Sequence, residues 1–473
     1  MWDLDKFSAN TALIDDLGNR LTYGDLRRES EALSSAVGSS RALVFCMAAN
    51  KIGSVIGYVG MMNAKIVPTM LNEDMDEASL SSLIETYRPA FVWVPERSTG
   101  KSLFPEFKPV YSAYGYVLLK TPYGFVTKVS DETALLLTTS GSTGSPKFVR
   151  QSYANVRANI NSIVEFLQLD ETERPITTLP MNYTYGLSII NTHIDVGAAI
   201  LMTEASVTQR AFWSFFKEEG ATSFGGVPYT YEMLKRLRFL RMDLPSLRSM
   251  TQAGGRLLPE LHREFAEYAE KEGKKFFVMY GQCEATARMA YLPPDMTLAK
   301  IGSVGIPVPG GRFELIDVDG KVIDEPDKVG ELVYYGANVT LGYAMSPQDL
   351  IKGDERGGRL ETGDMAKCDS DGFYYIVGRK KRFLKIFGNR VNLDDVECFL
   401  RSAFPDVDSA CGGVDDLLYI FADNEEKLPA MKQYVSEKTK IHPSAFKTVA
   451  LESLPRSQSG RILYEQLESY YEQ

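Results

Sequence analysis

Histidine, cysteine and long apolar runs are scarce in this sequence, and each scarcity argues against a class of protein. The 473 residues include only three histidines, which lie far apart, so a histidine-centred mechanism has little support. The five cysteines are scattered and form no CxxC pair. This argues against a disulfide framework or a zinc site and fits a reducing compartment such as the cytoplasm. No run of about 18 uncharged apolar residues exists, so we expect no membrane span.

An excess of positive charge is also lacking. The chain has 62 acidic and 52 basic residues and a net charge of -10. This balance disfavours nucleic acid or a membrane surface as a partner, although a local basic patch for a phosphate-rich ligand is compatible with it. The length predicts two to four structural units.

Strand-like and helix-like segments alternate through the first 240 residues. Strands are expected at 42–47, 64–70 and 91–94, and helices at 54–63 and 81–87. The same alternation returns between 200 and 238. It predicts an α/β fold with mostly parallel sheets flanked by helices.

The pattern changes after residue 293, where Gly, Asp and β-branched residues become dense. Short antiparallel strands with turns at Asp319-Gly320 and Asp371-Gly372 are expected there. We therefore predict a large N-terminal domain, residues 1–379, which includes a small β-barrel-like part. A small α+β domain is expected at 381–473.

A loop of hydroxyls and glycines, Thr139-Ser-Gly-Ser-Thr-Gly-Ser-Pro-Lys147, follows an apolar strand. Gly141 and Gly144 permit backbone geometries in which several N–H groups turn inward and hold a phosphate. Lys147 adds a positive charge. The spacing is not that of a Walker A loop, and such a loop alone would be read as a flexible linker.

Four further motif-like segments follow this loop along the chain. They are Gln252-Ala-Gly-Gly-Arg256, Tyr280-Gly-Gln-Cys-Glu284, Glu361-Thr-Gly-Asp364 and Leu454-Pro-Arg-Ser-Gln-Ser-Gly-Arg461. Together they resemble the adenylate-forming superfamily of acyl-CoA synthetases, luciferases and the adenylation domains of peptide synthetases. The resemblance extends from Leu21 to Gly460.

The resemblance implies an acid–thiol ligase that makes an acyl-adenylate from ATP with Mg²⁺ and then a thioester with CoA or a phosphopantetheinyl carrier protein. It also implies roles for individual residues. Lys147, Glu284 and Arg461 would be catalytic, and Glu284 and Thr143 would bind Mg²⁺. The nucleotide would be held by Thr139, Ser140, Gly141, Ser142, Thr143, Gly144, Gly254, Gly255, Tyr280, Gly281, Gln282, Cys283, Asp364 and Arg379.

Two positions depart from the family pattern. Cys283 stands where relatives carry Thr, and a thiol is a weaker hydrogen-bond donor to the α-phosphate. Arg461 stands where relatives carry the Lys that bridges the substrate carboxylate and the α-phosphate. Either Arg461 does this with shifted geometry, which we favour, or adenylation is slow, or the protein is tuned for another step.

The motif Pro180-Met-Asn-Tyr-Thr-Tyr-Gly-Leu187 matches the lining of the acyl pocket. Acyl-CoA synthetases often place His at the position of Tyr183, and amino-acid-activating relatives place Asp near Thr184. Without that Asp a buried ammonium is costly, so a small or medium carboxylic acid is expected. The expected walls are Tyr183, Thr184, Tyr185, Val227, Pro228 and Ala253.

The resemblance also places a hinge at Lys381, about which the small domain would turn between the two half-reactions. Several segments further resemble synthetases of bacterial surface-polysaccharide pathways. Two alternatives remain open: an amino-acid ligase for a carrier protein, and a catalytically weakened nucleotide-binding homologue. The second is motivated by Cys283 and Arg461.

Overall fold

The computed structural model describes residues 1–38, 41–99, 104, 106–138, 147–317, 319–387, 389–456 and 462–471, with backbone only at 381, 383, 389 and 390. The chain forms two compact units. Unit 1 comprises Met1–Ile301, Pro307–Arg312 and Tyr335–Leu360. Unit 2 comprises Gly302–Ile306, Phe313–Tyr334 and Glu361–Gln473.

One sheet of unit 1 has the strand order β19-β9-β8-β4-β3-β5-β7-β6. Its central strands β8, β4, β3 and β5 are parallel, and β9 turns back antiparallel to β8. Apolar side chains fill both faces of β3, which matches a parallel strand covered by helices. The bounds are β3 (Leu43–Ala48), β4 (Val67–Asn72), β5 (Phe91–Pro95), β6 (Lys108–Ala113), β7 (Tyr116–Lys120), β8 (Thr133–Thr138), β9 (Phe148–Ser152) and β19 (Gly342–Ala344).

A second sheet of unit 1 has the order β15-β14-β13-β12-β10-β11-β1-β2. Its strands from β14 to β1 are parallel, so their carboxyl ends lie at one edge. That edge is where ligands bind in open α/β sheets. The bounds are β1 (Thr11–Asp15), β2 (Arg20–Thr22), β10 (Pro175–Ile176), β11 (Ile200–Met202), β12 (Ser223–Gly226), β13 (Ser249–Gln252), β14 (Lys275–Tyr280) and β15 (Ala290–Tyr291).

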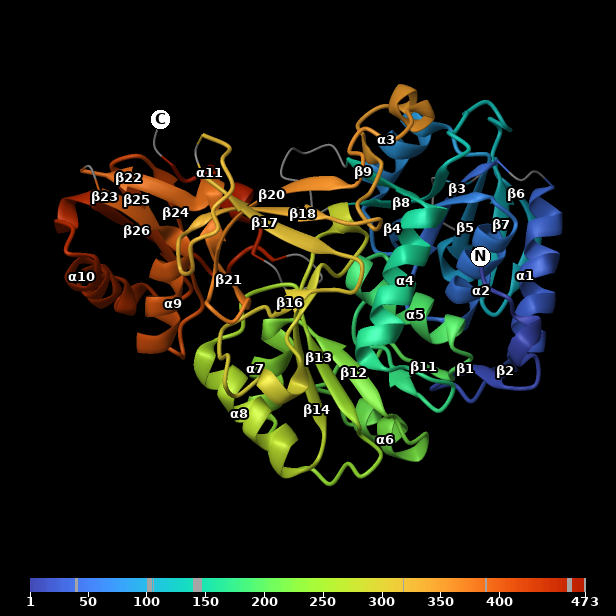
Figure 1. The fold of residues 1–473 in the computed structure, drawn as a ribbon. Helices are drawn as coiled ribbons and strands as arrows, with labels where there is room; N and C mark the ends of the chain where they lie inside the picture. Colours follow the sequence, from blue (N-terminus) through green and yellow to red (C-terminus); the bar gives the residue numbers. More distant parts are fainter. Residues whose placement is uncertain are drawn as a thin grey trace. The chain divides into compact units, whose positions relative to one another are not determined.

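Helices join these two sheets into one core (Figure 1). A single buried cluster contains residues of β3 and β8 from the first sheet, of β1 and β11 from the second, and of α1, α2, α4 and α5. The helices of unit 1 are α1 (Tyr23–Val37), α2 (Ile52–Asn63), α3 (Glu77–Tyr87), α4 (Tyr153–Leu167), α5 (Thr184–Asp195), α6 (Arg210–Glu218), α7 (Pro228–Arg236) and α8 (Pro259–Lys271).

Unit 2 contains two larger sheets, with orders β17-β18-β20-β21 and β24-β25-β26, and the hairpin β22-β23. The second sheet packs against α9 and α10 around a core that includes Leu400, Ile420 and Met431. The bounds are β17 (Arg312–Ile316), β18 (Gly330–Tyr335), β20 (Arg359–Cys368), β21 (Tyr374–Arg379), β22 (Phe383–Ile386), β23 (Asn389–Asn392), β24 (Ser409–Val414), β25 (Leu417–Ala422), β26 (Phe446–Ala450), α9 (Leu393–Ala403), α10 (Leu428–Thr439) and α11 (Tyr464–Glu468).

The predicted α/β class is confirmed, and the strand-rich part predicted as barrel-like corresponds to the sheet that contains β20 and β21. The helix expected at 81–87 begins earlier, at Glu77, because the Asp76 side chain caps it by accepting from the Ser79 N–H. Domain boundaries at 379 and 381, and a hinge between them, stay predictions. No helix in the described part of the chain is long and apolar enough to cross a membrane.

Candidate active site

Glu284, the predicted Mg²⁺ ligand, lies in a short turn of 3-10 helix, η4 (Cys283–Ala285), just after β14. Its carbonyl accepts hydrogen bonds from the Thr340 N–H and hydroxyl, each at 3.0 Å, and from the Arg356 guanidinium at 3.1 Å. Its carboxylate accepts from the Tyr343 hydroxyl, with 2.6 Å between Oη and Oε1. Backbone and side chain of Glu284 are thus both held from the segment 340–356.

Tyr343 connects Glu284 to the predicted catalytic lysine. Lys147 Nζ lies over the Tyr343 ring, 4.3 Å from its centroid, and Arg356 Cζ lies 4.7 Å from the same centroid. Burial and the Glu284 carboxylate raise the pKa of Tyr343, so its hydroxyl stays protonated and donates to Glu284. The structure therefore brings Lys147 and Glu284 together around one half-buried ring.

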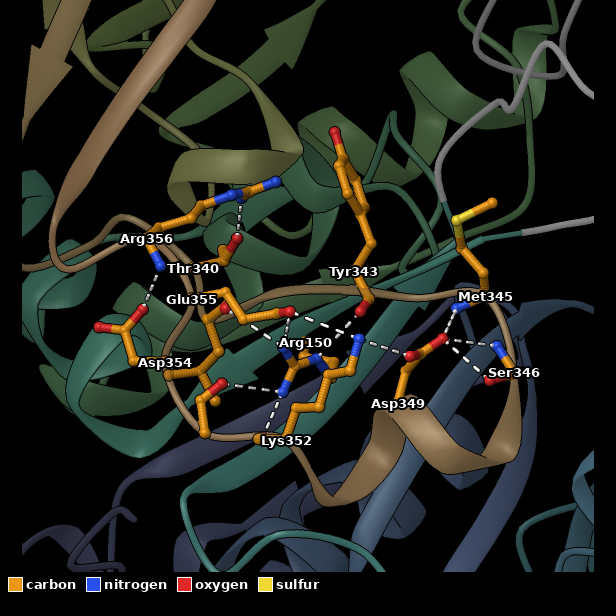
Figure 2. Close-up of polar contacts among 12 residues, drawn as sticks. Arg150, Thr340, Tyr343, Met345, Ser346, Asp349, Lys352, Asp354, Glu355 and Arg356 are labelled. Carbon is orange, nitrogen blue, oxygen red and sulfur yellow. Dashed lines mark hydrogen bonds and ion pairs between the residues drawn. The ribbon is translucent and has the colours of Figure 1, made fainter.

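A buried arginine holds the segment that carries Tyr343. Arg150, on β9, is fully buried and donates to the carbonyls of Tyr343, Leu341 and Gly353 at 3.1–3.3 Å. It also forms an ion pair with Glu355 at 2.5 Å. Figure 2 shows Arg150 at the centre of these contacts. Gly342 permits this packing, because a Cβ there would come within 2.6 Å of the Glu355 carboxylate.

The next turn of this segment has its own carboxylate cap. Asp349, in η6 (Pro347–Ile351), accepts from the N–H groups of Met345 and Ser346 and forms an ion pair with Lys352 at 2.8 Å (Figure 2). Lys352 and these N–H groups hold the pKa of Asp349 well below its usual range. The segment after Tyr343 is therefore fixed at two points, Arg150 and Asp349.

The predicted nucleotide residues next to Glu284 also lie together in unit 1. Tyr280 ends β14, and Gln282 Nε2 donates to its hydroxyl at 3.3 Å. Gly281 is required by space, because a Cβ there would lie 1.7 Å from the Ala287 carbonyl oxygen. Cys283 is half-buried and forms no disulfide. Gly254 and Gly255 follow the end of β13, which pairs with β14.

Four of the six predicted acyl-pocket residues belong to one apolar cluster. Tyr185, Val227 and Ala253 are buried in it, and Tyr183 packs against it. A pocket formed by them stays a prediction. Thr184 instead donates its hydroxyl to the Thr286 carbonyl. Pro228 is the first residue of α7, beside Val227.

Two of the predicted nucleotide-binding residues meet in unit 2. Asp364 on β20 is opposite Arg379 on β21, and Arg379 Nε lies 2.9 Å from Asp364 Oδ1. Asp364 is buried while Arg379 is exposed. Lys381 lies in the short turn η7 (Lys380–Arg382), described for its backbone only.

Several predicted site residues lie outside the described part of the chain. They are Arg461 and the loop residues Thr139, Ser140, Gly141, Ser142, Thr143 and Gly144. The two flanking residues are described: Thr138 ends β8 and pairs with Phe148 at the start of β9. Lys147, directly before Phe148, is thereby fixed at the sheet.

The sequence interpretation missed Tyr343, Arg356 and Arg288. Tyr343 and Arg356 carry no motif of their own and meet Glu284 only through tertiary folding. Arg288 could have been detected from the sequence, since it is the one charged residue in the otherwise uncharged stretch 285–294. It is 3% exposed and contacts Tyr185 of the predicted acyl pocket. Across the described residues, no cluster of three or more His, Cys, Asp or Glu side chains could hold a metal.

Comparisons with known proteins agree with this arrangement. The family model "AMP-binding enzyme" matches residues 2–344. An oxalate–CoA ligase of Arabidopsis thaliana is 29% identical over 347 residues, which are 70% of this chain and 66% of that protein. This chain thus spans just under two thirds of that relative's length. A 2-succinylbenzoate–CoA ligase of Bacillus subtilis is 27% identical over 71% of this chain and 69% of that protein.

Solved structures show the same fold over nearly the whole chain. The o-succinylbenzoate CoA synthetase of Bacillus subtilis, in complex with its acyl-adenylate intermediate, has a TM-score of 0.78 at 22% identity and covers 97% of this chain and 95% of its own. The same enzyme with ATP and a magnesium ion has a TM-score of 0.77, also at 22% identity, with 97% and 96% of the two chains covered. Because the family model matches well over half of the residues, this chain belongs to the AMP-binding enzyme family.

Proposed function

We propose that this protein activates a small carboxylic acid in two steps. A carboxylate oxygen of the acid attacks the α-phosphorus of ATP, and the bond to pyrophosphate breaks, which gives acyl-AMP. The sulfur of a thiol, after loss of its proton, then attacks the acyl carbonyl carbon. AMP leaves with the electron pair of the broken C–O bond, and a thioester remains.

The contact between Glu284, Tyr343 and Lys147 carries the proposal. Lys147 brings positive charge to the place where the phosphate-binding loop returns to the sheet, and positive charge stabilises the charge that develops on transferring phosphates. Glu284 lies at the carboxyl end of a parallel strand, where open α/β sheets bind ligands. The cluster of Tyr185, Val227 and Ala253 supplies an apolar wall for the acid.

The residues present fit a Mg²⁺ ion that arrives with the nucleotide. Such an ion takes only one or two protein carboxylates beside phosphate and water oxygens. The second oxygen of Glu284, Oε2, makes no hydrogen bond with the described residues. Glu284 and the hydroxyl of Thr143 would hold the ion, which when bound neutralises phosphate charge.

CoA is the thiol that we favour, because the named relatives are CoA ligases. A phosphopantetheinyl carrier protein presents the same thiol chemistry and is the second acceptor to test. An α-amino acid is disfavoured as substrate, since the cation of Arg288 lies 4.8 Å from the ring centroid of Tyr185 and would repel an ammonium in that pocket.

We also propose that residues 381–473 turn about Lys381 between the two steps, so that one cleft serves both. Lys381→Pro should fix the backbone φ at this position. We expect this variant to keep acid-dependent pyrophosphate release and to lose thioester formation. Equal loss of both steps would argue against a hinge at Lys381.

Pyrophosphate release tests the proposed function. Purified protein with Mg·ATP is offered a panel of carboxylates, and CoA thioesters are measured by mass spectrometry after CoA is added. We expect release with one class of acid and thioester only with CoA. Glu284→Gln should lower the rate by about 10²-fold or more, as for other lost transition-state contacts.

Glu267→Gln, an exposed change on α8, is the matched control and should leave the rate unchanged. Arg461→Lys should raise the rate if the arginine limits adenylation. If neither wild type nor Arg461→Lys releases pyrophosphate with any acid while ATP still binds in calorimetry, the ligase proposal fails. The nucleotide-binding homologue would then be the better description.

A further inference from the structure

Arg288 is a buried cation without a carboxylate partner. It lies between η4 and β15, and only 3% of it is exposed. Its Nη1 donates to the Ser188 hydroxyl at 2.9 Å, and its Nε–H is buried without a hydrogen-bond partner. Within the described residues no Asp or Glu forms an ion pair with it. Among the described residues, no acidic side chain pairs with this positive charge inside unit 1.

Burying an unpaired charge is costly, and arginines inside proteins are normally paired with carboxylates or phosphates. Guanidinium also matches a carboxylate geometrically, because its N–H groups form a planar fork. A buried arginine with an unused N–H group therefore indicates that an anion outside the protein chain completes the pairing.

The neighbours of Arg288 place that anion at the predicted acyl pocket. Its Cζ lies 4.8 Å from the centroid of the Tyr185 ring, and Ser188 follows one turn later on α5. Tyr185 shares its cluster with Val227 and Ala253, two of the other predicted walls. The charge therefore lies beside Tyr185, a predicted wall of the acyl pocket.

A small cavity adjoins the guanidinium. It measures about 20 Å³ and is lined by Arg288, by residues of α5 that include His193, and by residues of the second sheet that include Gly225 and Thr251. That volume holds one water-sized atom, which is also the size of one carboxylate oxygen. His193 Nδ1 lies 2.8 Å from the Ile189 carbonyl, so it donates there and leaves Nε2 as an acceptor facing no partner.

We propose that Arg288 binds a second anionic group of the substrate, so that this enzyme selects short acids that carry two acidic groups. One group is activated at the nucleotide, and the other pairs with Arg288. The inference rests on the proposed function, which it narrows from small carboxylic acids to diacids. The simpler alternative is that Arg288 only packs against Tyr185 and Ser188 as part of the core.

Calorimetry with isosteric ligands separates these two explanations. The full chain, with α,β-methylene ATP and Mg²⁺ present, is titrated with oxalate, malonate, succinate and phthalate and with the corresponding monoamides. Each monoamide keeps the size of its diacid and loses one charge. We expect one diacid to bind about 100-fold more tightly than its monoamide, because a site built for a polar group rejects the analogue that lacks it.

Arg288→Met should remove that preference by weakening the diacid and leaving the monoamide within a few-fold. Arg288→Lys keeps the charge but loses the planar fork, so it should keep part of the preference. If Arg288→Met fails to fold, which circular dichroism would show, Arg288→Lys replaces it as the test variant. Arg157→Met, which removes a cation paired with Asp195 outside this cluster, is the control and should keep the wild-type preference.

Three results would overturn the inference: no diacid binds, each diacid and its monoamide bind wild type equally, or Arg288→Met weakens both equally. Pyrophosphate release is measured in parallel with the same ligands. If no acid supports release, the proposed function fails. Even if no acid supports release, diacid binding that is lost in Arg288→Met would establish the anion site. If no diacid binding depends on Arg288, the anion site is rejected as well.

Discussion

Tyr343 has a role at the candidate site that its residue type alone would not indicate. A tyrosine beside a carboxylate usually makes only an ordinary surface hydrogen bond. Here the ring contacts Lys147 and Arg356, and the hydroxyl donates to Glu284. We interpret Tyr343 as a positioning residue that fixes one oxygen of Glu284 and leaves the other free for Mg²⁺.

Replacing Tyr343 by Phe should test this interpretation, because it removes the donor and keeps the ring. We expect the KM for Mg²⁺ to rise several-fold and the rate of pyrophosphate release to fall by about 10-fold, less than the loss of a group that contacts the transition state directly. The measurement is acid-dependent pyrophosphate release over a range of Mg²⁺ concentrations. Tyr335→Phe, whose hydroxyl accepts from Arg359 elsewhere, is the control. A purely structural role would lower thermal stability without changing the Mg²⁺ dependence.

Sequence reasoning located Glu284 and Lys147 because each ends a motif of consecutive residues. It did not locate Tyr343, because the contact joins positions 59 residues apart and depends on how β19 pairs with β9. Arg288 shows the same limit. It is the one charged residue in the stretch 285–294, but only folding reveals that Tyr185 and Ser188 are its neighbours. Contacts between distant segments are decided by tertiary packing, which motifs do not encode.

At the scale of elements, β9 links the end of the predicted phosphate-binding loop, Lys147, to the segment that holds Glu284. Lys147 immediately precedes this strand, and Arg150 on it binds the carbonyls around Tyr343. The strand β19 pairs antiparallel with β9, and Gly342 lies opposite Arg150. One buried side chain therefore sets the distance between the two halves of the candidate site.

Arg150→Met should uncouple these halves. The change leaves several carbonyls without their donor, and a buried acceptor left unsatisfied costs about 1–3 kcal/mol. Some of the freed carbonyls would reach water, so we expect a total loss of about 3–5 kcal/mol, comparable to breaking a buried ion pair. Urea denaturation measures the loss, and pyrophosphate release should fall with it. Lys352→Met, at a half-exposed partner of Asp349, should leave the free energy of unfolding nearly unchanged.

The locations of helices and strands were predicted more accurately than their first and last residues. The strand expected at 42–47 is β3 (Leu43–Ala48), and the helix expected at 54–63 is α2 (Ile52–Asn63). Apolar periodicity locates the body of an element because burial determines it. Ends depend on single caps, as Asp76 shows for α3, and on pairing partners far away in sequence.

At the scale of the whole molecule, unit 1 can be observed separately from unit 2. All three tryptophans, Trp2, Trp93 and Trp213, lie in Met1–Ile301, so tryptophan fluorescence reports the unfolding of unit 1. Two buried histidines, His193 and His262, lie in the same unit. Burial lowers the pKa of each from 6.5 to about 4.

These lowered pKa values predict an acid-sensitive unit 1. Between pH 6.5 and 4 the two histidines are protonated in the unfolded chain but stay neutral in the folded protein. Because the unfolded chain binds more protons, the free energy of unfolding falls as the pH falls. Each histidine should contribute a loss of roughly 3 kcal/mol across this range. His193→Gln with His262→Gln should therefore flatten the pH dependence, measured by urea denaturation with tryptophan fluorescence at each pH. His442→Gln, at an exposed position in unit 2, should leave the curve unchanged. If the double variant loses stability in acid as steeply as wild type, other groups cause the loss, and the two imidazoles are not the acid-sensitive sites of this unit.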